Sequence, residues 1–132
     1  MKIVVNGTFD ILHVGHILML EHAKSLGDHL LVCIDTDRRV KELKGSARPV
    51  NNQNHRAFLL MALKCVDAVW FFDSDKELIK HLTLYKPDIM VKGSDWEGKP
   101  IVGEEHCGRI EFFKRIDEYS TTKTIQHIID RR

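Results

Sequence analysis

Two histidines stand three residues apart near the beginning of the chain. Residues 7–16 read G-T-F-D-I-L-H-V-G-H, so that His13 and His16 enclose Gly15. At the start of a helix, side chains at this spacing share one face, and the helix end supplies backbone N–H groups and partial positive charge. Gly15 leaves room for an anion to approach the backbone closely. Two imidazoles directed at one anion could stabilise the charge that develops on a phosphorus centre.

The same spacing also allows structural interpretations. An H-x-x-H pair occurs by chance, contributes ordinary surface polarity, or supplies half of a metal site. No third and fourth ligand stands at the spacing of a zinc site. The pair alone does not distinguish these cases, so its interpretation depends on the elements around it.

Strand-like and helix-like segments alternate along the chain and would position these histidines. Apolar runs predict strands over residues 2–6, 29–35, 66–72, 87–91 and 109–113. Apolar residues at helical spacing predict helices over 14–26, 52–64, 76–85 and from 120 onwards, and the polar residues 36–51 are predicted to form a loop. Strands without polar alternation indicate burial on both faces. We therefore predict an α/β fold with a Rossmann-like, doubly wound parallel sheet of about five strands, helices on both faces, and a ligand at the carboxyl ends of the strands.

Length and composition limit the classes of protein to consider. The 132 residues predict a single domain over 1–132. Twenty Lys and Arg against 19 Asp and Glu give a net charge of +1, without the basic excess of nucleic-acid-binding proteins. No apolar run approaches the roughly 18 residues of a membrane span, and the N-terminal run has no signal-peptide cleavage site. With three widely spaced cysteines that form no disulfide framework, we expect a cytoplasmic protein without a nucleic-acid or membrane partner.

Residues 7–16 resemble the signature of the cytidylyltransferase-like nucleotidyltransferases. Further segments similar to that family are L-G-D-H-L at 26–30, Arg56 with the later Val66-Asp67, D-W-E-G-K at 95–99 and S-T-T at 120–122. Members transfer a nucleotidyl group from a nucleoside triphosphate to a phosphorylated acceptor and release pyrophosphate. The resemblance extends over essentially the whole chain and implies a Rossmann-like sheet, Mg²⁺ as cofactor and a homodimer.

The types of residue present suit this reaction. A phosphate monoester has a second pKa of about 6, so the acceptor is largely a dianion at pH 7 and needs no general base. The reaction requires in-line positioning and neutralisation of the triphosphate. We therefore expect in-line attack without a covalent intermediate, with Mg²⁺ held mainly by substrate phosphates.

The resemblance implies roles for residues of the motif. Thr8, Phe9 and Gly15 would line the nucleotide site. His13 and His16 would contact the triphosphate and stabilise the transition state, which makes them the candidate catalytic residues.

The resemblance also implies roles for residues outside the histidine pair. Lys44, on the predicted polar loop, is the third candidate catalytic residue and would reach a phosphate of the nucleotide or the acceptor; otherwise it is a solvated lysine. Asp10 would hold the turn or contribute to substrate or metal binding. Asp95 and Trp96 follow a strand end and are candidate acceptor contacts, with a loop anchor as the structural alternative for Trp96.

The last segment resembles the glycerol-3-phosphate cytidylyltransferases, which carry R-x-x-G-x-S-T-T. Residues 115–122 read R-I-D-E-Y-S-T-T, so Arg115 matches while Glu118 replaces the glycine. Ser120, Thr121 and Thr122 would bind phosphate through hydroxyl and N–H groups, or cap a helix. By contrast, residues 43–51, L-K-G-S-A-R-P-V-N, are very similar to the heptose-1-phosphate adenylyltransferases of ADP-heptose synthesis.

Arg115 determines our prediction, because its guanidinium could donate to a cytosine carbonyl or to phosphate. We predict a cytidylyltransferase that transfers CMP from CTP to a phosphorylated alcohol, glycerol 3-phosphate, for the synthesis of a cell-surface polymer. The alternative within the family transfers AMP from ATP to heptose 1-phosphate. The alternative from another class is a non-catalytic nucleotide-binding module on the same fold.

Overall fold

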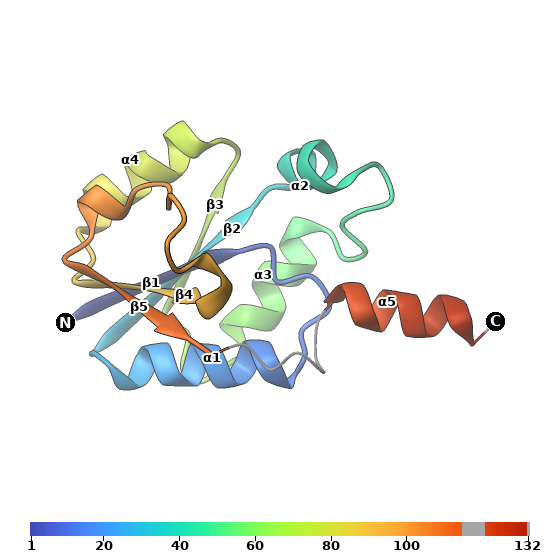
Figure 1. Ribbon diagram of the computed structural model, residues 1–132, viewed down its shortest axis with the longest axis horizontal. Helices are drawn as coiled ribbons and strands as arrows, with labels where there is room; N and C mark the ends of the chain where they lie inside the picture. The colour runs from blue at the N-terminus through green and yellow to red at the C-terminus, as the bar shows by residue number, and fades with distance from the viewer. Residues whose placement is uncertain (115–120, 132) are drawn as a thin grey trace.

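A parallel sheet of five strands forms the centre of the protein (Figure 1). The computed structural model describes residues 1–114 and 121–131, without the side chain of Thr121. The strands are β1 (Lys2–Gly7), β2 (His29–Asp35), β3 (Ala68–Phe72), β4 (Ile89–Gly93) and β5 (Arg109–Phe113). Their order is β3-β2-β1-β4-β5, and every neighbouring pair is parallel. The predicted doubly wound α/β fold is therefore confirmed.

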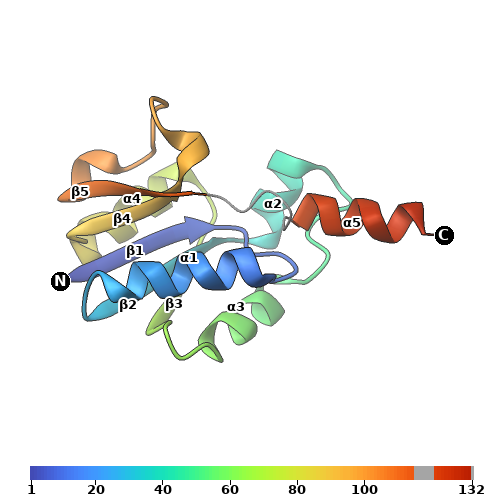
Figure 2. The same cartoon turned by 60° about the horizontal axis from the view of Figure 1, so that its bottom comes forward.

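Helices cover both faces of the sheet (Figure 2). They are α1 (Val14–Ser25), α2 (Asp37–Lys44), α3 (Gln53–Met61), α4 (Asp75–Tyr85) and α5 (Thr121–Asp130), with short 3-10 turns η1 (Ser94–Trp96) and η2 (Glu104–His106). Helix α5 projects beyond the carboxyl edge of the sheet, so only its first turn lies near the strand ends (Figures 1 and 2). No helix among the described residues is long and apolar enough to span a membrane.

The core consists of two layers, one on each face of the sheet. Successive strand residues point to opposite faces, so Ile3 packs with Leu20 of α1 and Leu60 of α3, whereas Val4 packs with Leu78 of α4. All five side chains are buried to 2% exposure or less. Because both faces are covered, the middle parts of the central strands β1, β2 and β4 are apolar without interruption.

The carboxyl ends of β1 and β4 form the point where the chain changes direction across the sheet. From β1 the chain passes through α1 to β2, and from β3 it returns through α4, on the opposite face, to β4. A crevice forms where two neighbouring strands send the chain to opposite sides. Gly7 ends β1 and Gly93 ends β4, so the histidine motif and the segment after β4 meet at this crevice.

The prediction of a loop over residues 36–51 is wrong for its first half, which forms α2. This helix buries only Val40 and therefore shows no apolar periodicity. Polar contacts stabilise it instead: Thr36 Oγ1 caps the backbone N of Arg39, and Arg38 pairs with Glu42 one turn later. Gly45 ends the helix with a φ of 99°, which favours glycine. Lys44 is consequently the last residue of a helix and not part of a loop.

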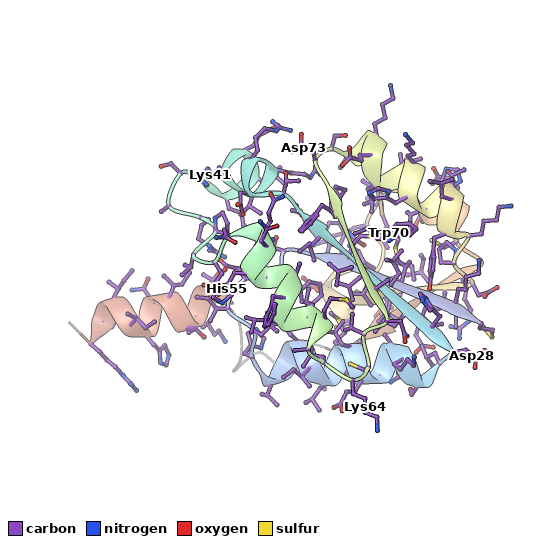
Figure 3. All side chains as sticks on the ribbon, turned by 180° about the vertical axis from the view of Figure 1, so that it is seen from behind. Asp28, Lys41, His55, Lys64, Trp70 and Asp73 are labelled. Atoms are coloured by element: carbon purple, nitrogen blue, oxygen red, sulfur yellow. The ribbon has the colours of Figure 1, made fainter. Side chains whose placement is uncertain are left out.

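The remaining predicted boundaries differ from the observed ones by three residues or fewer. Trp70, on β3, faces α4, and its ring lies 5.3 Å from that of His81 (Figure 3). Its side chain is only partly buried, because β3 is an edge strand.

Candidate active site

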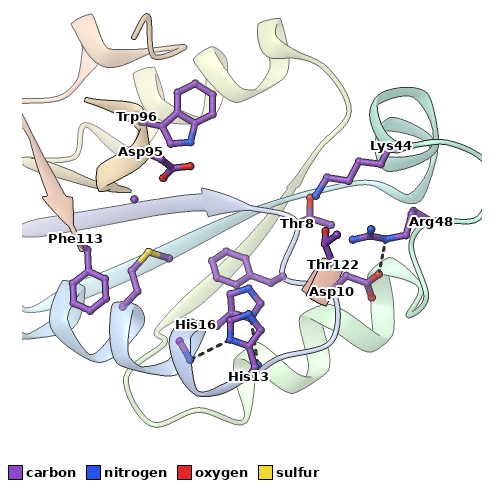
Figure 4. A pocket seen from close by; sticks show the side chains of 14 residues that line it. Thr8, Asp10, His13, His16, Lys44, Arg48, Asp95, Trp96, Phe113 and Thr122 are labelled. Carbon is purple, nitrogen blue, oxygen red and sulfur yellow. Dashed lines mark hydrogen bonds and ion pairs between the residues drawn. The ribbon is translucent and has the colours of Figure 1, made fainter. Parts of the chain in front are cut away.

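A reciprocal cap made by two histidines begins helix α1. His13 is the N-cap residue, and its Nδ1 accepts a hydrogen bond from the backbone N of Gly15 at 3.1 Å. In return, Nδ1 of His16 accepts a hydrogen bond from the backbone N of His13 at 3.4 Å. This is a capping box in which imidazoles replace the usual hydroxyl and carboxylate (Figure 4).

The cap determines which ring nitrogen can act on a ligand. A neutral imidazole has one N–H donor and one acceptor nitrogen. Because Nδ1 is the acceptor in both His13 and His16, the proton of each neutral ring resides on Nε2. Each histidine can therefore offer an Nε2–H donor to a phosphate oxygen.

The turn between β1 and α1 is tight enough to force two residues into the left-handed region. Phe9 and Ile11 both have a φ of 52°, a conformation that costs a non-glycine residue on the order of 1–3 kcal/mol. The ring of Phe9 is buried and lies 5.2 Å from that of His16. The two strained residues lie in the turn that places the histidines at the carboxyl end of β1.

A pocket of about 250 Å³ opens at the crevice between β1 and β4 (Figure 4). It brings together predicted residues from four parts of the chain: Thr8, Phe9, Asp10, His13, Gly15, His16, Lys44, Asp95, Trp96 and Thr122. The histidines lie at one end of this pocket, Lys44 at a second, and Asp95 with Trp96 at a third (Figure 4). Thr122 places the first turn of α5 beside the same pocket.

Three of the predicted site residues lie wholly or partly outside the described structure. Arg115 and Ser120 lie outside the described residues, as does the side chain of Thr121. The roles expected for them remain predictions.

Four further residues line the pocket that we did not predict: Met19, Arg48, Gly93 and Phe113. Met19 follows His16 by three residues and shares its helix face, a signal that the sequence contained. Arg48 follows Lys44 by four residues, but the two do not share a helix, because α2 ends at Lys44. The loop after α2 brings Arg48 to the pocket that Lys44 also lines. Phe113 comes from β5, which no local pattern connects to the histidines.

Asp10 fixes the loop that carries Arg48. The Asp10 side chain is 1% exposed and accepts hydrogen bonds from the backbone N of Val50 at 2.7 Å and of Asn51 at 2.9 Å. Its Oδ2 also lies 3.7 Å from Nε of Arg48. Asp10 therefore joins the turn of the histidine motif to residues 48–51.

Arg56 is a fully buried cation directly behind the pocket. It donates to the carbonyl of Thr8 at 2.9 Å and to that of Asn51 at 3.0 Å, and its Nη2 lies 2.9 Å from Oδ1 of Asp37. One guanidinium thus joins the end of β1, the loop before α3 and the first turn of α2. Three separate nitrogens of its planar fork each reach a different acceptor, whereas the donors of a lysine all radiate from one nitrogen.

Beyond β4, a carboxylate and an indole form the third end of the pocket. A Cβ at Gly93 would lie 2.6 Å from Oδ1 of Asp95, so glycine leaves space for that carboxylate. Nζ of Lys92 lies 4.4 Å from the centroid of the Trp96 ring, a cation–π contact that orients the indole. Burial lowers the pKa of Lys92, although Asp35 and Asp95 act against this shift.

Metal binding by the protein alone finds no support in the described part of the chain. Among residues 1–114 and 121–131, no group of three or more His, Cys, Asp or Glu side chains is placed to hold a metal ion. The two histidines use Nδ1 for the helix cap. An anion is thus the ligand that this end of the pocket suits best.

Comparison with known proteins gives a consistent picture. A family model described as "Cytidylyltransferase-like" matches residues 4–127. The "Bifunctional protein HldE" of Aliarcobacter butzleri (strain RM4018) is 48% identical over 130 residues, which cover 96% of this chain and 27% of that protein. The protein of the same name from Campylobacter fetus subsp. fetus (strain 82-40) is 50% identical over 126 residues, with the same coverage. The chain therefore spans about a quarter of the length of these relatives.

A solved structure has the same fold. It is the crystal structure of the lipopolysaccharide core biosynthesis protein from Thermoplasma volcanium GSS1, with a TM-score of 0.73 and 28% sequence identity. The similarity covers 89% of this chain and 98% of that one.

Proposed function

The chain belongs to the cytidylyltransferase-like family of nucleotidyltransferases, and from this premise we propose that it transfers AMP from ATP to heptose 1-phosphate and releases pyrophosphate. The observation that carries this proposal is the sequence identity of 48% and 50% with two HldE proteins, over nearly the whole length of this chain. That similarity favours the adenylyltransferase over the cytidylyltransferase of the glycerol-3-phosphate type. Residues 43–51, which resemble the heptose-1-phosphate enzymes, support the same choice.

The argument for CTP rests chiefly on Arg115, with the S-T-T at 120–122 and the D-W-E-G-K at 95–99 beside it. Glu118 stands where the cytidylyltransferases have glycine, so the segment after Arg115 departs from the sequence pattern of that subfamily. A match at one arginine weighs less than similarity along 126 residues or more. CTP and glycerol 3-phosphate become the second choice of substrates.

The histidine pair would supply most of the transition-state stabilisation. Nε2–H of His13 and of His16 would donate to oxygens of the triphosphate, where charge increases as the pyrophosphate leaves. The first turn of α1 adds the partial positive charge of its N-terminus. Both effects are present before the substrate binds, because the cap fixes the rings.

Direct attack by the acceptor phosphate suits the pocket. Among the described residues that line it, none is a serine or a cysteine. The acceptor dianion is itself a nucleophile. The protein would hold the two substrates in line, with no covalent intermediate.

Magnesium would accompany the triphosphate. Mg²⁺ is commonly held by one or two carboxylates together with substrate phosphates, where it neutralises phosphate charge. Asp95 lines the pocket and is the carboxylate we assign to this role, since both oxygens of Asp10 accept backbone N–H groups. A single carboxylate with phosphates and water fits the absence of a larger ligand cluster among the described residues.

The proposal is tested by calorimetric titration with ATP and CTP, each with Mg²⁺, followed by measurement of pyrophosphate release. We expect ATP to bind at least about tenfold more tightly, a difference of about 1.4 kcal/mol, and heptose 1-phosphate to give turnover that His16→Ala abolishes. Tighter binding of CTP with turnover of glycerol 3-phosphate would restore the cytidylyltransferase. Nucleotide binding without pyrophosphate release from any phosphorylated acceptor would indicate a non-catalytic module.

A further inference from the structure

We propose that Arg48 binds the phosphate group of the acceptor, an inference that rests on the proposed nucleotidyl transfer to a sugar phosphate. Arg48 lines the pocket, and its side chain is only 15% exposed. Figure 4 shows the guanidinium on the same side of the pocket as the ammonium of Lys44. These two cations form the cationic end of the pocket.

The Nε of Arg48 is buried and makes no hydrogen bond with the described part of the chain. The contact with Asp10 is an ion pair at 3.7 Å, too long for a hydrogen bond. A buried polar group of this kind in a native protein requires an explanation, and a ligand is one of the few available.

Asp10 orients Arg48 without satisfying it. Both Asp10 oxygens already accept backbone N–H groups, of Val50 and of Asn51. The carboxylate therefore fixes the loop and attracts the guanidinium, while the fork of Arg48 keeps donors for another acceptor. A phosphate oxygen pair matches that planar fork in a bidentate manner.

The charge balance favours the acceptor phosphate over the triphosphate. In the proposed reaction the triphosphate would be neutralised by Mg²⁺, the α1 N-terminus and the histidine donors. The acceptor is a dianion that must approach another anion without a metal of its own. Fixed cations on the acceptor side lower this repulsion, and Arg48 with Lys44 supplies two of them.

The test uses Arg48→Gln and Arg48→Lys, with Arg38→Gln as the matched control. Arg38 lies on α2, pairs with Asp73 and Glu42 at the surface, and does not line the pocket. Initial rates are measured with the acceptor varied at saturating ATP, and then with ATP varied. We expect KM for the acceptor to rise about 10- to 100-fold in Arg48→Gln, as for a lost charged hydrogen bond, with KM for ATP changed less than about threefold. Arg48→Lys keeps the charge but not the fork, so it should recover only part of the loss, and Arg38→Gln should behave as the wild type.

Other outcomes would overturn the inference. An unchanged KM for the acceptor in both variants would remove Arg48 from substrate binding, and a rise confined to KM for ATP would assign it to the triphosphate. Inorganic phosphate serves as a second probe: it should inhibit the wild type competitively with the acceptor and should do so less in Arg48→Lys. If no sugar phosphate is turned over, the proposed function fails. Protection of the wild type by inorganic phosphate against thermal unfolding, absent in Arg48→Lys, would still establish a phosphate site, and equal protection of both proteins would refute it.

Discussion

The imidazole rings of His13 and His16 stack with their centroids 3.8 Å apart and an angle of 22° between their planes. The stack follows from the helix cap, in which each ring accepts a backbone N–H through Nδ1. The same two side chains therefore begin α1 and present Nε2–H donors to the pocket. Stability and the proposed catalytic role would thus depend on different atoms of one residue, which makes them separable by substitution.

Replacement of His13 by asparagine should separate the two functions. The Asn oxygen occupies a position close to that of Nδ1 and is a good N-cap acceptor, but no atom replaces Nε2. We expect the free energy of unfolding of His13→Asn to lie within about 0.5 kcal/mol of the wild-type value. The rate of pyrophosphate release should fall about 10²- to 10³-fold. His13→Ala should lose activity similarly and about 1 kcal/mol of stability as well. Equal activity of His13→Asn and the wild type in the pyrophosphate assay would contradict the role of Nε2.

Asp10 should affect stability and acceptor binding together. In Asp10→Asn, one of the two partly buried backbone N–H groups loses its acceptor, and we expect the free energy of unfolding in urea to fall by about 1–2 kcal/mol. Because the loop carries Arg48, KM for the acceptor should rise more than KM for ATP. The control is Asp28→Asn, whose carboxylate pairs only at the surface, with the N-terminal amine and far from the pocket. A stable Asp10→Asn variant with wild-type kinetics would show that the loop is held by other contacts.

The fold was accessible from the sequence because its strands are buried on both faces. Runs such as residues 29–35 contain almost no polar residues, and this pattern predicts a parallel sheet. Helix α2 was missed because only Val40 of its eight residues is buried. Its stability comes from the Thr36 cap and from charged pairs, which leave no apolar period.

The histidine end of the pocket follows from local sequence, and the family resemblance indicated the more distant Lys44, Asp95, Trp96 and Thr122. Arg48 was not predicted, because tertiary contacts place it. His13 and His16 are close in sequence and share a helix end, so their proximity could be foreseen. Arg48 reaches the pocket only because Asp10 holds its loop from 38 residues away along the chain. The expected homodimer and Mg²⁺ remain predictions.

The contact between α1 and the edge strand β5 should make stability depend on pH. Glu111 accepts a hydrogen bond from His22 at 2.6 Å, and this bond, followed by that from Arg109, lowers the pKa of Glu111. The folded state then binds fewer protons than the unfolded state near the ordinary pKa of about 4.5. The contribution is fully present above that pH and is lost as the pH falls through the lowered folded-state pKa.

Urea unfolding of the wild type and Glu111→Gln measures this effect. At pH 7 and low salt we expect the variant to be less stable by about 0.5–1 kcal/mol, a value limited by partial exposure to solvent. The difference should shrink as the pH falls below 4.5 and also in 1 M salt (roughly a 3 Å screening length). A difference that stays constant with pH would instead indicate a loss of packing.

Arg56 should be the most sensitive position behind the pocket. In Arg56→Met the carbonyls of Thr8 and Asn51 lose their donor inside the protein, and Asp37 loses its cation. We expect the free energy of unfolding, measured in urea, to fall by about 3–5 kcal/mol, as is typical when one partner is removed from a buried ionic network. Arg56→Lys should recover only part of this, because one ammonium cannot bond all three groups. Asp37→Asn should cost less, about 1 kcal/mol, because its side chain is 30% exposed and water can replace the arginine. If Arg56→Met lost no more than Asp37→Asn, the ion pair would account for the whole effect, and the two carbonyl bonds of Arg56 would not be what holds the end of β1 against the loop.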